Sequence, residues 1–155
     1  MTHEEQEDVM TQQEQQEQQE QHEEQVARQS VEAGERYAGA VARYFEAWNA
    51  TEEGARAKAV AAAFGEDVTY TDPLADVAGH EGLVAAIAGA QAQFPGFVFR
   101  PLGGVDGHHD MARFGWELVG VADGSAPVAG FDVVRLGADG RIRSVFGFLD
   151  RVPAV

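Results

Sequence analysis

The hydrophobic pattern changes from helical spacing to alternation part of the way along this 155-residue chain. Up to about Gln93 the apolar side chains mostly recur three and four apart, as in helices that bury one face. From Phe97 onward they alternate with polar residues between turn residues, which is typical of strands. Helices followed by an antiparallel meander predict an α+β domain whose three N-terminal helices cover one face of a curved sheet.

Three helices are predicted before the meander. The first runs from about residue 31 to residue 50 and carries an apolar stripe. The second runs from about 53 to 64, with Gly65 after it in the C-terminal capping role, and the third from about 79 to 93. The stripe of the first helix consists of Tyr37, Val41, Tyr44, Phe45 and Trp48.

A short strand, "VTYTDP", lies between the second and third helices. Alternation places Val68, Tyr70 and Asp72 on one side of it, and Asp76 beyond it is expected in a loop. Four further strands are predicted in "FVFRPL", "HHDMARFGWELVG", "APVAGFDVVRLG" and "RIRSVFGFLDRV". Hairpin turns are expected at residues 106–107, 123–125 and 138–140, where Gly supplies a positive φ.

The first thirty residues differ in composition from the remainder. Residues 11–25 contain no hydrophobic side chain, and the repeat "EQQEQQEQHE" spaces its glutamates three apart. Such a segment cannot bury a core, so we expect a Gln/Glu-rich disordered or loosely helical tail over residues 1–30 and a folded domain over 31–155. A partner-binding arm is the alternative for the tail.

Charge and composition exclude several classes of function. Residues 1–30 carry a net charge of −8 and residues 31–155 a net charge of −7. Because phosphate binding needs clusters of Lys and Arg, we expect neither nucleic acid nor a membrane surface as a partner. The absence of cysteine excludes disulfides, thiolate nucleophiles and cysteine-ligated zinc. No signal peptide or long apolar run is seen, so a soluble cytoplasmic protein is expected.

Three ionisable side chains lie on the inward side of their predicted elements: Tyr44, Asp72 and Asp132. A carboxyl among apolar neighbours must be paired or protonated. An ion pair with Arg113 or Arg135 would explain Asp132 without any chemistry. Tyr44 taken alone is more typical of a core tyrosine whose hydroxyl has found a partner than of a catalytic residue.

At these residues the sequence resembles the nuclear transport factor 2-like superfamily, in its SnoaL-like and ketosteroid isomerase-like branch. The resemblance covers residues 36–152, from "VARYFEAWNA" through "EDVTYTDP" to "GFDVVRLGADGRIRSVFGFLD". It implies a cone-shaped, strongly curved and mostly antiparallel sheet that encloses a pocket for a small apolar molecule. It also implies a homodimer.

The resemblance to the isomerases implies a role for each of the three residues. Asp72, in the "DP" motif, corresponds to the base that removes a proton next to a carbonyl. Tyr44, in "RY", corresponds to a donor to the resulting oxyanion, and Asp132, in "DVVR", to a protonated carboxylic acid that donates a second hydrogen bond. Ketosteroid isomerase is a standard example of such a neutral acid. We therefore predict Tyr44, Asp72 and Asp132 as catalytic residues.

Five aromatic residues are predicted to bind the substrate: Trp48, Phe97, Phe114, Trp116 and Phe148. Ordinary core packing or a dimer interface would account for them equally well. No metal is expected, because His108 and His109 are neighbours on a strand and point to opposite faces, and the role of His80 is left open. No phosphate-binding loop is present, so no cofactor is expected.

Two functions from different classes follow. The first is a small cofactor-independent isomerase or cyclase that transfers a proton next to the carbonyl of an apolar molecule. The second is a non-catalytic module of the same fold that binds a hydrophobic ligand or forms dimers. An epoxide hydrolase-like reaction, by Asp72, Arg113 and Asp132, ranks third because alternation points Arg113 away from the pocket.

Overall fold

The computed structural model describes the backbone of residues 3–153 and the side chains of residues 11–153. Residues 1–2 of the predicted tail and 154–155 of the predicted domain lie outside the described residues. The elements follow one another as α1 (His3–Asn49), α2 (Glu53–Ala63), β1 (Phe64–Thr71), β2 (Asp76–Ala78), α3 (Gly79–Gln93), β3 (Phe97–His108), β4 (Met111–Gly120), β5 (Val128–Leu136) and β6 (Ile142–Arg151).

The chain divides into two compact units, Met1–Glu35 and Arg36–Val155. In the first unit α1 is helical and the side chains of residues 11–30 are all exposed, which agrees with the absence of hydrophobic residues over 11–25. The prediction that residues 1–30 form a tail outside the folded domain, with the domain over 31–155, stays a prediction. No helix among the described residues is both long enough and apolar enough to cross a membrane.

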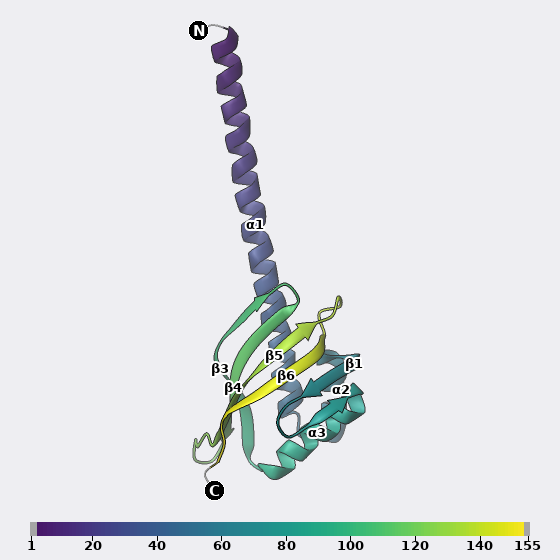
Figure 1. Cartoon of the computed structure of the whole chain (residues 1–155). Helices are drawn as coiled ribbons and strands as arrows, with labels where there is room; N and C mark the ends of the chain where they lie inside the picture. The colour runs from purple at the N-terminus through teal and green to yellow at the C-terminus, as the bar shows by residue number, and fades with distance from the viewer. Residues whose placement is uncertain (1–2, 154–155) are drawn as a thin grey trace. The chain divides into compact units, whose positions relative to one another are not determined.

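The second unit is built on one six-stranded curved sheet, with strand order β2-β1-β6-β5-β4-β3 (Figure 1). The strands from β3 to β6 form the predicted antiparallel meander. β1 joins the meander by pairing in parallel with β6, and the short β2 pairs with β1. With three helices, this open curved sheet confirms the predicted α+β fold.

Alternation along the strands decides which face of the sheet is buried. Asp132, Val134 and Leu136 on β5 are buried, while the residues between them are only half-buried. The apolar stripe of α1, from Tyr37 to Trp48, is buried as predicted. The concave face therefore packs on the helices, and any acid on it is removed from water.

Three local predictions were wrong, and the pairing of β1 was not predicted. Gly65 does not cap α2, because Phe64 is already extended and begins β1. Asp76 lies in β2 rather than in a loop. β1 pairs in parallel, outside the meander. The turn between β3 and β4 falls at residues 109–110, where His109 has a φ of 50°, because β3 continues past the expected turn to His108.

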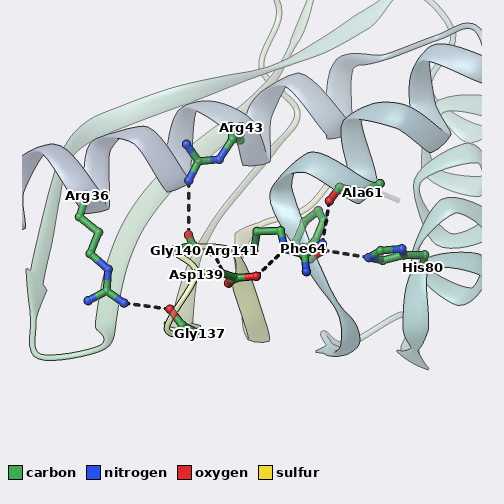
Figure 2. A network of polar contacts seen from close by, with 9 residues as sticks. All are labelled: Arg36, Arg43, Ala61, Phe64, His80, Gly137, Asp139, Gly140 and Arg141. Carbon is green, nitrogen blue, oxygen red and sulfur yellow. Dashed lines mark hydrogen bonds and ion pairs between the residues drawn. The ribbon is translucent and has the colours of Figure 1, made fainter.

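Arginine side chains tie the helices to the turn between β5 and β6 (Figure 2). From α1, Arg36 donates to the carbonyl of Gly137 at 3.0 Å and Arg43 to that of Gly140 at 3.3 Å. Arg141 donates to the carbonyl of Phe64 at 3.3 Å, where α2 meets β1. Because Arg43 precedes Tyr44, this network helps to fix the part of α1 that carries the candidate tyrosine.

Candidate functional site

A cavity of about 600 Å³ lies in the second unit, bounded by α1, α3 and the inner face of the sheet. Its size is within the usual range for pockets that bind small molecules. Its wall is mostly apolar, and the residues that form it are Tyr44, Trp48, Tyr70, Asp72, Leu74, Ala75, Ala86, Gly89, Ala90, Gln93, Phe94, Phe99, Trp116, Leu118, Val128, Leu149, Val152 and Pro153.

Asp72 is held on this wall by three hydrogen bonds. Its Oδ1 accepts from the backbone N–H groups of Leu74 and Ala75, both at 2.7 Å. Its Oδ2 accepts from the hydroxyl of Tyr70 at 2.5 Å. The first two bonds form the turn that Pro73 begins, since an Asp side chain readily bonds the backbone that follows it. The carboxylate is therefore fixed in orientation before any ligand arrives.

Asp132 lies behind the wall, on β5, and is 2% exposed. Its Oδ2 accepts a short hydrogen bond from the hydroxyl of Tyr44, and its Oδ1 accepts one from the indole N–H of Trp116 at 3.2 Å. Both donors line the cavity. Asp132 thus acts on the cavity through the two side chains that it holds.

Burial governs the ionisation of this pair. Loss of solvent raises the pKa of Asp132 to about 6, against the hydrogen bonds from Tyr44 and Trp116, which lower it. Burial, followed by the charge of Asp132, raises the pKa of the Tyr44 hydroxyl well above its ordinary value. Tyr44 is therefore a neutral donor at physiological pH, whereas Asp132 changes charge near pH 6.

Two glycines make room for this arrangement. A Cβ at Gly147 on β6 would lie 2.9 Å from Asp132 Oδ1 and 3.1 Å from the Cβ of Asp72, so the two acids approach each other across it. A Cβ at Gly130 on β5 would lie 2.7 Å from the indole of Trp116, which packs over this position. The structure thus brings the three predicted residues, Tyr44, Asp72 and Asp132, together.

The five aromatic residues predicted to bind substrate lie in four different places. Trp48 and Trp116 line the cavity. Phe114 lies in the core, with its ring centroid 4.9 Å from that of Tyr44, and Phe97 lines a different hollow. Phe148 lies on the outer face of the sheet and is 51% exposed. A register irregularity in β6 between Ile142 and Ser144 shifts the alternation, so that Val145 and Gly147 face the core and Phe148 faces outward.

The two arginines considered as partners of Asp132 face the other side of the sheet. Arg113 pairs with Asp106 at 3.3 Å, and both side chains are 70% exposed. Arg135 pairs with Asp110 at 3.1 Å. The ion-pair explanation of Asp132 was therefore wrong, and the Asp, Arg, Asp set of an epoxide hydrolase is not assembled.

Tyr70 belongs to the site although the sequence reading did not select it. It is 4% exposed, and burial raises the pKa of its hydroxyl. Its position in the sequence could have identified it, because Tyr70 lies two residues before Asp72 on the same side of β1 and the two side chains are therefore neighbours. Among the described residues no group of three or more potential metal ligands gathers.

Comparison with known proteins identifies the family. A family model described as a SnoaL-like domain matches residues 41–145. A proposed isomerase of the SnoaL-like family from Agrobacterium tumefaciens is 38% identical, with a TM-score of 0.71, and the match covers 74% of this chain and 97% of that one. No curated protein matches the chain significantly.

More distant structures share the fold. A proposed SnoaL-like polyketide cyclase from Jannaschia is 20% identical, with a TM-score of 0.62, over 76% of this chain and 87% of that one. A proposed polyketide cyclase from Sinorhizobium meliloti is 21% identical, with a TM-score of 0.55, over 72% and 94%. The family match over residues 41–145 and the 38% identical structure establish that the chain belongs to the SnoaL-like family.

Proposed function

We propose that the protein is a cofactor-independent enzyme that moves a proton next to the carbonyl group of an apolar small molecule, as an isomerase or a cyclase. One observation carries the proposal: the fixed carboxylate of Asp72 lies on the wall of an apolar cavity beside the hydrogen-bonded pair of Tyr44 and Asp132. The 38% identical protein from Agrobacterium tumefaciens, itself a proposed isomerase, supports the same class of reaction.

In the proposed reaction Asp72 takes a proton from the carbon next to the carbonyl. The electrons of that C–H bond form the enolate, and its oxygen receives a hydrogen bond from Tyr44. A proton returned from Asp72 to another carbon of the conjugated system completes an isomerisation. No further reactant is needed, because Asp72 returns one proton for each one that it takes; in D2O the proton held by Asp72 exchanges with solvent, so deuterium is returned to the substrate.

Asp132 controls whether Tyr44 has a hydrogen bond to give. When Asp132 is ionised, it accepts the Tyr44 proton, so that proton is not directed at a ligand. When Asp132 is neutral, its own O–H donates to the Tyr44 oxygen and the Tyr44 proton is free to turn to the substrate. Negative charge that develops on the substrate favours the neutral form, since a nearby negative charge raises the pKa of a carboxyl group.

Exchange of hydrogen for deuterium in a simple ketone tests this proposal. 2-Tetralone, a bicyclic apolar ketone, is incubated with the protein in D2O, and loss of its α-proton signal is followed by NMR. We expect Asp72→Asn to slow the enzymatic exchange by about 10²–10⁴-fold, the usual contribution of a general base, while tetralone binding persists. The matched control is Asp76→Asn, which changes an exposed acid four residues away.

The second candidate, a hydrophobic-ligand-binding module without chemistry, is favoured by the size and apolar wall of the same cavity. It predicts that tetralone binds but that its exchange rate is the same with and without protein. Equal exchange rates for the wild type and the Asp72→Asn variant would rule out the enzymatic proposal and leave the binding one.

We also propose that two copies associate through the outer face of the sheet. Phe146 and Phe148 are 44% and 51% exposed there, and the ring of Phe131 stacks on that of Phe148 at 4.9 Å. Charges can pair across a two-fold contact only where both signs occur on the same surface, because each copy meets the same surface of the other. Ion pairs on these strands and on the turn at residues 109–110 supply both signs: Arg113–Asp106, Arg135–Asp110 and Arg151–Glu117. Light scattering should report a dimer that Phe148→Lys converts to a monomer.

A further inference from the structure

A second hollow, of about 360 Å³, lies where the end of α1, α2 and α3 meet the start of β3. Trp48 and Phe94 line both this hollow and the main cavity, so they form the partition between the two. The hollow contains one side chain that is always charged, Arg56 of α2. The proposed reaction gives this hollow no role.

Arg56 has hydrogen-bond partners but no anion. Its Nη2 donates to the side-chain oxygen of Gln91 at 2.6 Å and to the carbonyl of Thr51 at 3.2 Å, both of which are neutral. Its Nε is buried without an acceptor. None of the ion pairs between described side chains includes Arg56. A half-buried guanidinium without a carboxylate is unusual, because buried charges are normally paired.

The nearest candidate for a counter-ion is already engaged. Glu52 caps α2, and its carboxylate accepts from the backbone N–H groups of Gly54 at 3.0 Å and Ala55 at 2.8 Å. These two bonds, and then the charge of Arg56, lower the pKa of Glu52. Glu52 therefore feels the charge of Arg56 but forms no ion pair with it.

A second unpartnered donor belongs to Trp48, which lines both the hollow and the main cavity. Trp48 is 6% exposed, and its indole N–H has no acceptor. An N–H group left unpaired in the interior costs about 1–3 kcal/mol. Gln91 holds both neighbours in place, since its amide also donates to the carbonyl of Trp48 at 2.9 Å. Arg56 and Trp48, which each keep one N–H group without an acceptor, thus both contact Gln91.

We propose that this second hollow binds a small organic monocarboxylate. The carboxylate would pair with the planar guanidinium of Arg56, which matches carboxylate geometry, beside the ring of Trp48 that lines the hollow. The apolar part would contact Phe94, Pro95 and Phe97, which line the same hollow. A polyanion such as a nucleotide fits less well, because Arg56 is the single cation of the wall and the chain carries a charge of −15.

Benzoate is the probe and benzamide its neutral counterpart of nearly equal shape. Binding is followed through the two indole N–H resonances in ¹H–¹⁵N NMR spectra, with Trp116→Phe assigning the Trp48 signal. We expect benzoate to shift the Trp48 resonance with a Kd of about 1 mM, the range of a small fragment. Benzamide and inorganic phosphate should each bind at least tenfold more weakly.

Two pairs of variants locate the site. Arg56→Gln should weaken benzoate binding at least tenfold, whereas Arg100→Gln, at an exposed arginine outside the hollow, should leave the Kd unchanged. Ala88→Phe fills the hollow and should abolish binding, whereas Ala86→Phe, two residues away on α3, fills the main cavity and should not. Circular dichroism and thermal melting confirm that each variant is folded.

Several results would overturn the proposal. These are no shift of the Trp48 resonance up to about 20 mM benzoate, equal affinities for benzoate and benzamide, or benzoate binding that survives Arg56→Gln. Binding that Ala86→Phe removes and Ala88→Phe spares would assign benzoate to the main cavity, and would also overturn it. All of these readouts measure binding, so they are independent of whether the protein is an enzyme.

Discussion

Replacing Asp132 by Asn should change how the stability of the protein depends on pH. The substitution keeps the size of the side chain but removes its ionisation. In the wild type, Asp132 is buried and its pKa is raised from an ordinary value of 3.8 to about 6. Because the pKa is higher in the folded than in the unfolded state, the folded state binds more protons between these values, and stability falls as the pH rises through them.

The size of this effect follows from the difference between the two pKa values. About two pKa units correspond to about 3 kcal/mol of stability, present below pH 4 and lost above pH 6. About half of this change, near 1.5 kcal/mol, falls between pH 5 and pH 8. The Asn side chain also loses one acceptor for Tyr44 or Trp116, at a cost of about 1–3 kcal/mol that does not vary with pH. The pH-dependent part is therefore the cleaner measurement.

Urea unfolding at four pH values from 5 to 8 measures this dependence. Tryptophan fluorescence is the suitable signal, because Trp48 and Trp116 both lie in the unit from Arg36 to Val155. Lower pH is avoided because the isoelectric point is about 4.5. The difference between the two unfolding free energies, wild type minus Asp132→Asn, should decrease by about 1.5 kcal/mol from pH 5 to pH 8.

A matched control uses an acid whose pKa is shifted in the opposite direction. The hydrogen bond from Arg135 lowers the pKa of Asp110 below its ordinary 3.8, so both its folded and unfolded values lie under the measured range. The difference between the wild type and Asp110→Asn should therefore be constant from pH 5 to pH 8. A constant difference for Asp132→Asn as well would refute the argument that burial controls the ionisation of Asp132.

Three other perturbations test separate parts of the site. Tyr70→Phe removes the donor to Asp72 and should cost about 1–2 kcal/mol in urea unfolding, and it should lower kcat for tetralone exchange with little change in KM. Gly147→Ala places a Cβ 2.9 Å from Asp132 and should destabilise the protein by about 1–3 kcal/mol, whereas Gly104→Ala, with open space around it, should change stability by under about 0.5 kcal/mol. Deleting residues 1–30 should leave the thermal transition of the domain in place, because the side chains of residues 11–30 are exposed; loss of that transition would contradict the prediction of a tail.

The sequence predicts those elements whose pattern repeats within one segment. The bounds of α3 were expected because helical spacing persists up to "FPG", which ends the helix. β2 was missed because three residues are too few for alternation to be seen. The parallel pairing of Tyr70 with Val145 joins residues far apart in the chain, and no local signal encodes it.

The same distinction explains which site residues were found. Asp72 and Asp132 were selected because a carboxyl group in an apolar strand is conspicuous by itself. Tyr70 was passed over because a tyrosine on the inner face of a strand is indistinguishable from a core residue until its hydroxyl partner is known. The hydrogen bond from Trp116 to Asp132 depends on Gly130, which lets the indole lie over β5.

The order of the strands supplies the spacing that the proposed chemistry needs. Asp72 follows β1 and Asp132 lies on β5, with β6 between them. Neighbouring strands are about 4.8 Å apart, so the backbones of β1 and β5 are separated by about 10 Å at this point. The side chains of Asp72 and Asp132 lean toward each other over Gly147, so their carboxyl groups are closer together than the backbones. Tyr44, which is hydrogen-bonded to Asp132 and lines the cavity, brings the proposed donor closer still to Asp72. Removing a proton beside a carbonyl requires a base at the carbon and a donor at the oxygen, which are separated by two bonds of the substrate. β6, with Gly147 at this point, keeps Asp72 and Asp132 apart by one strand while leaving room for their side chains to approach. If β1 and β5 were adjacent, the two acids would lie close enough to share one proton.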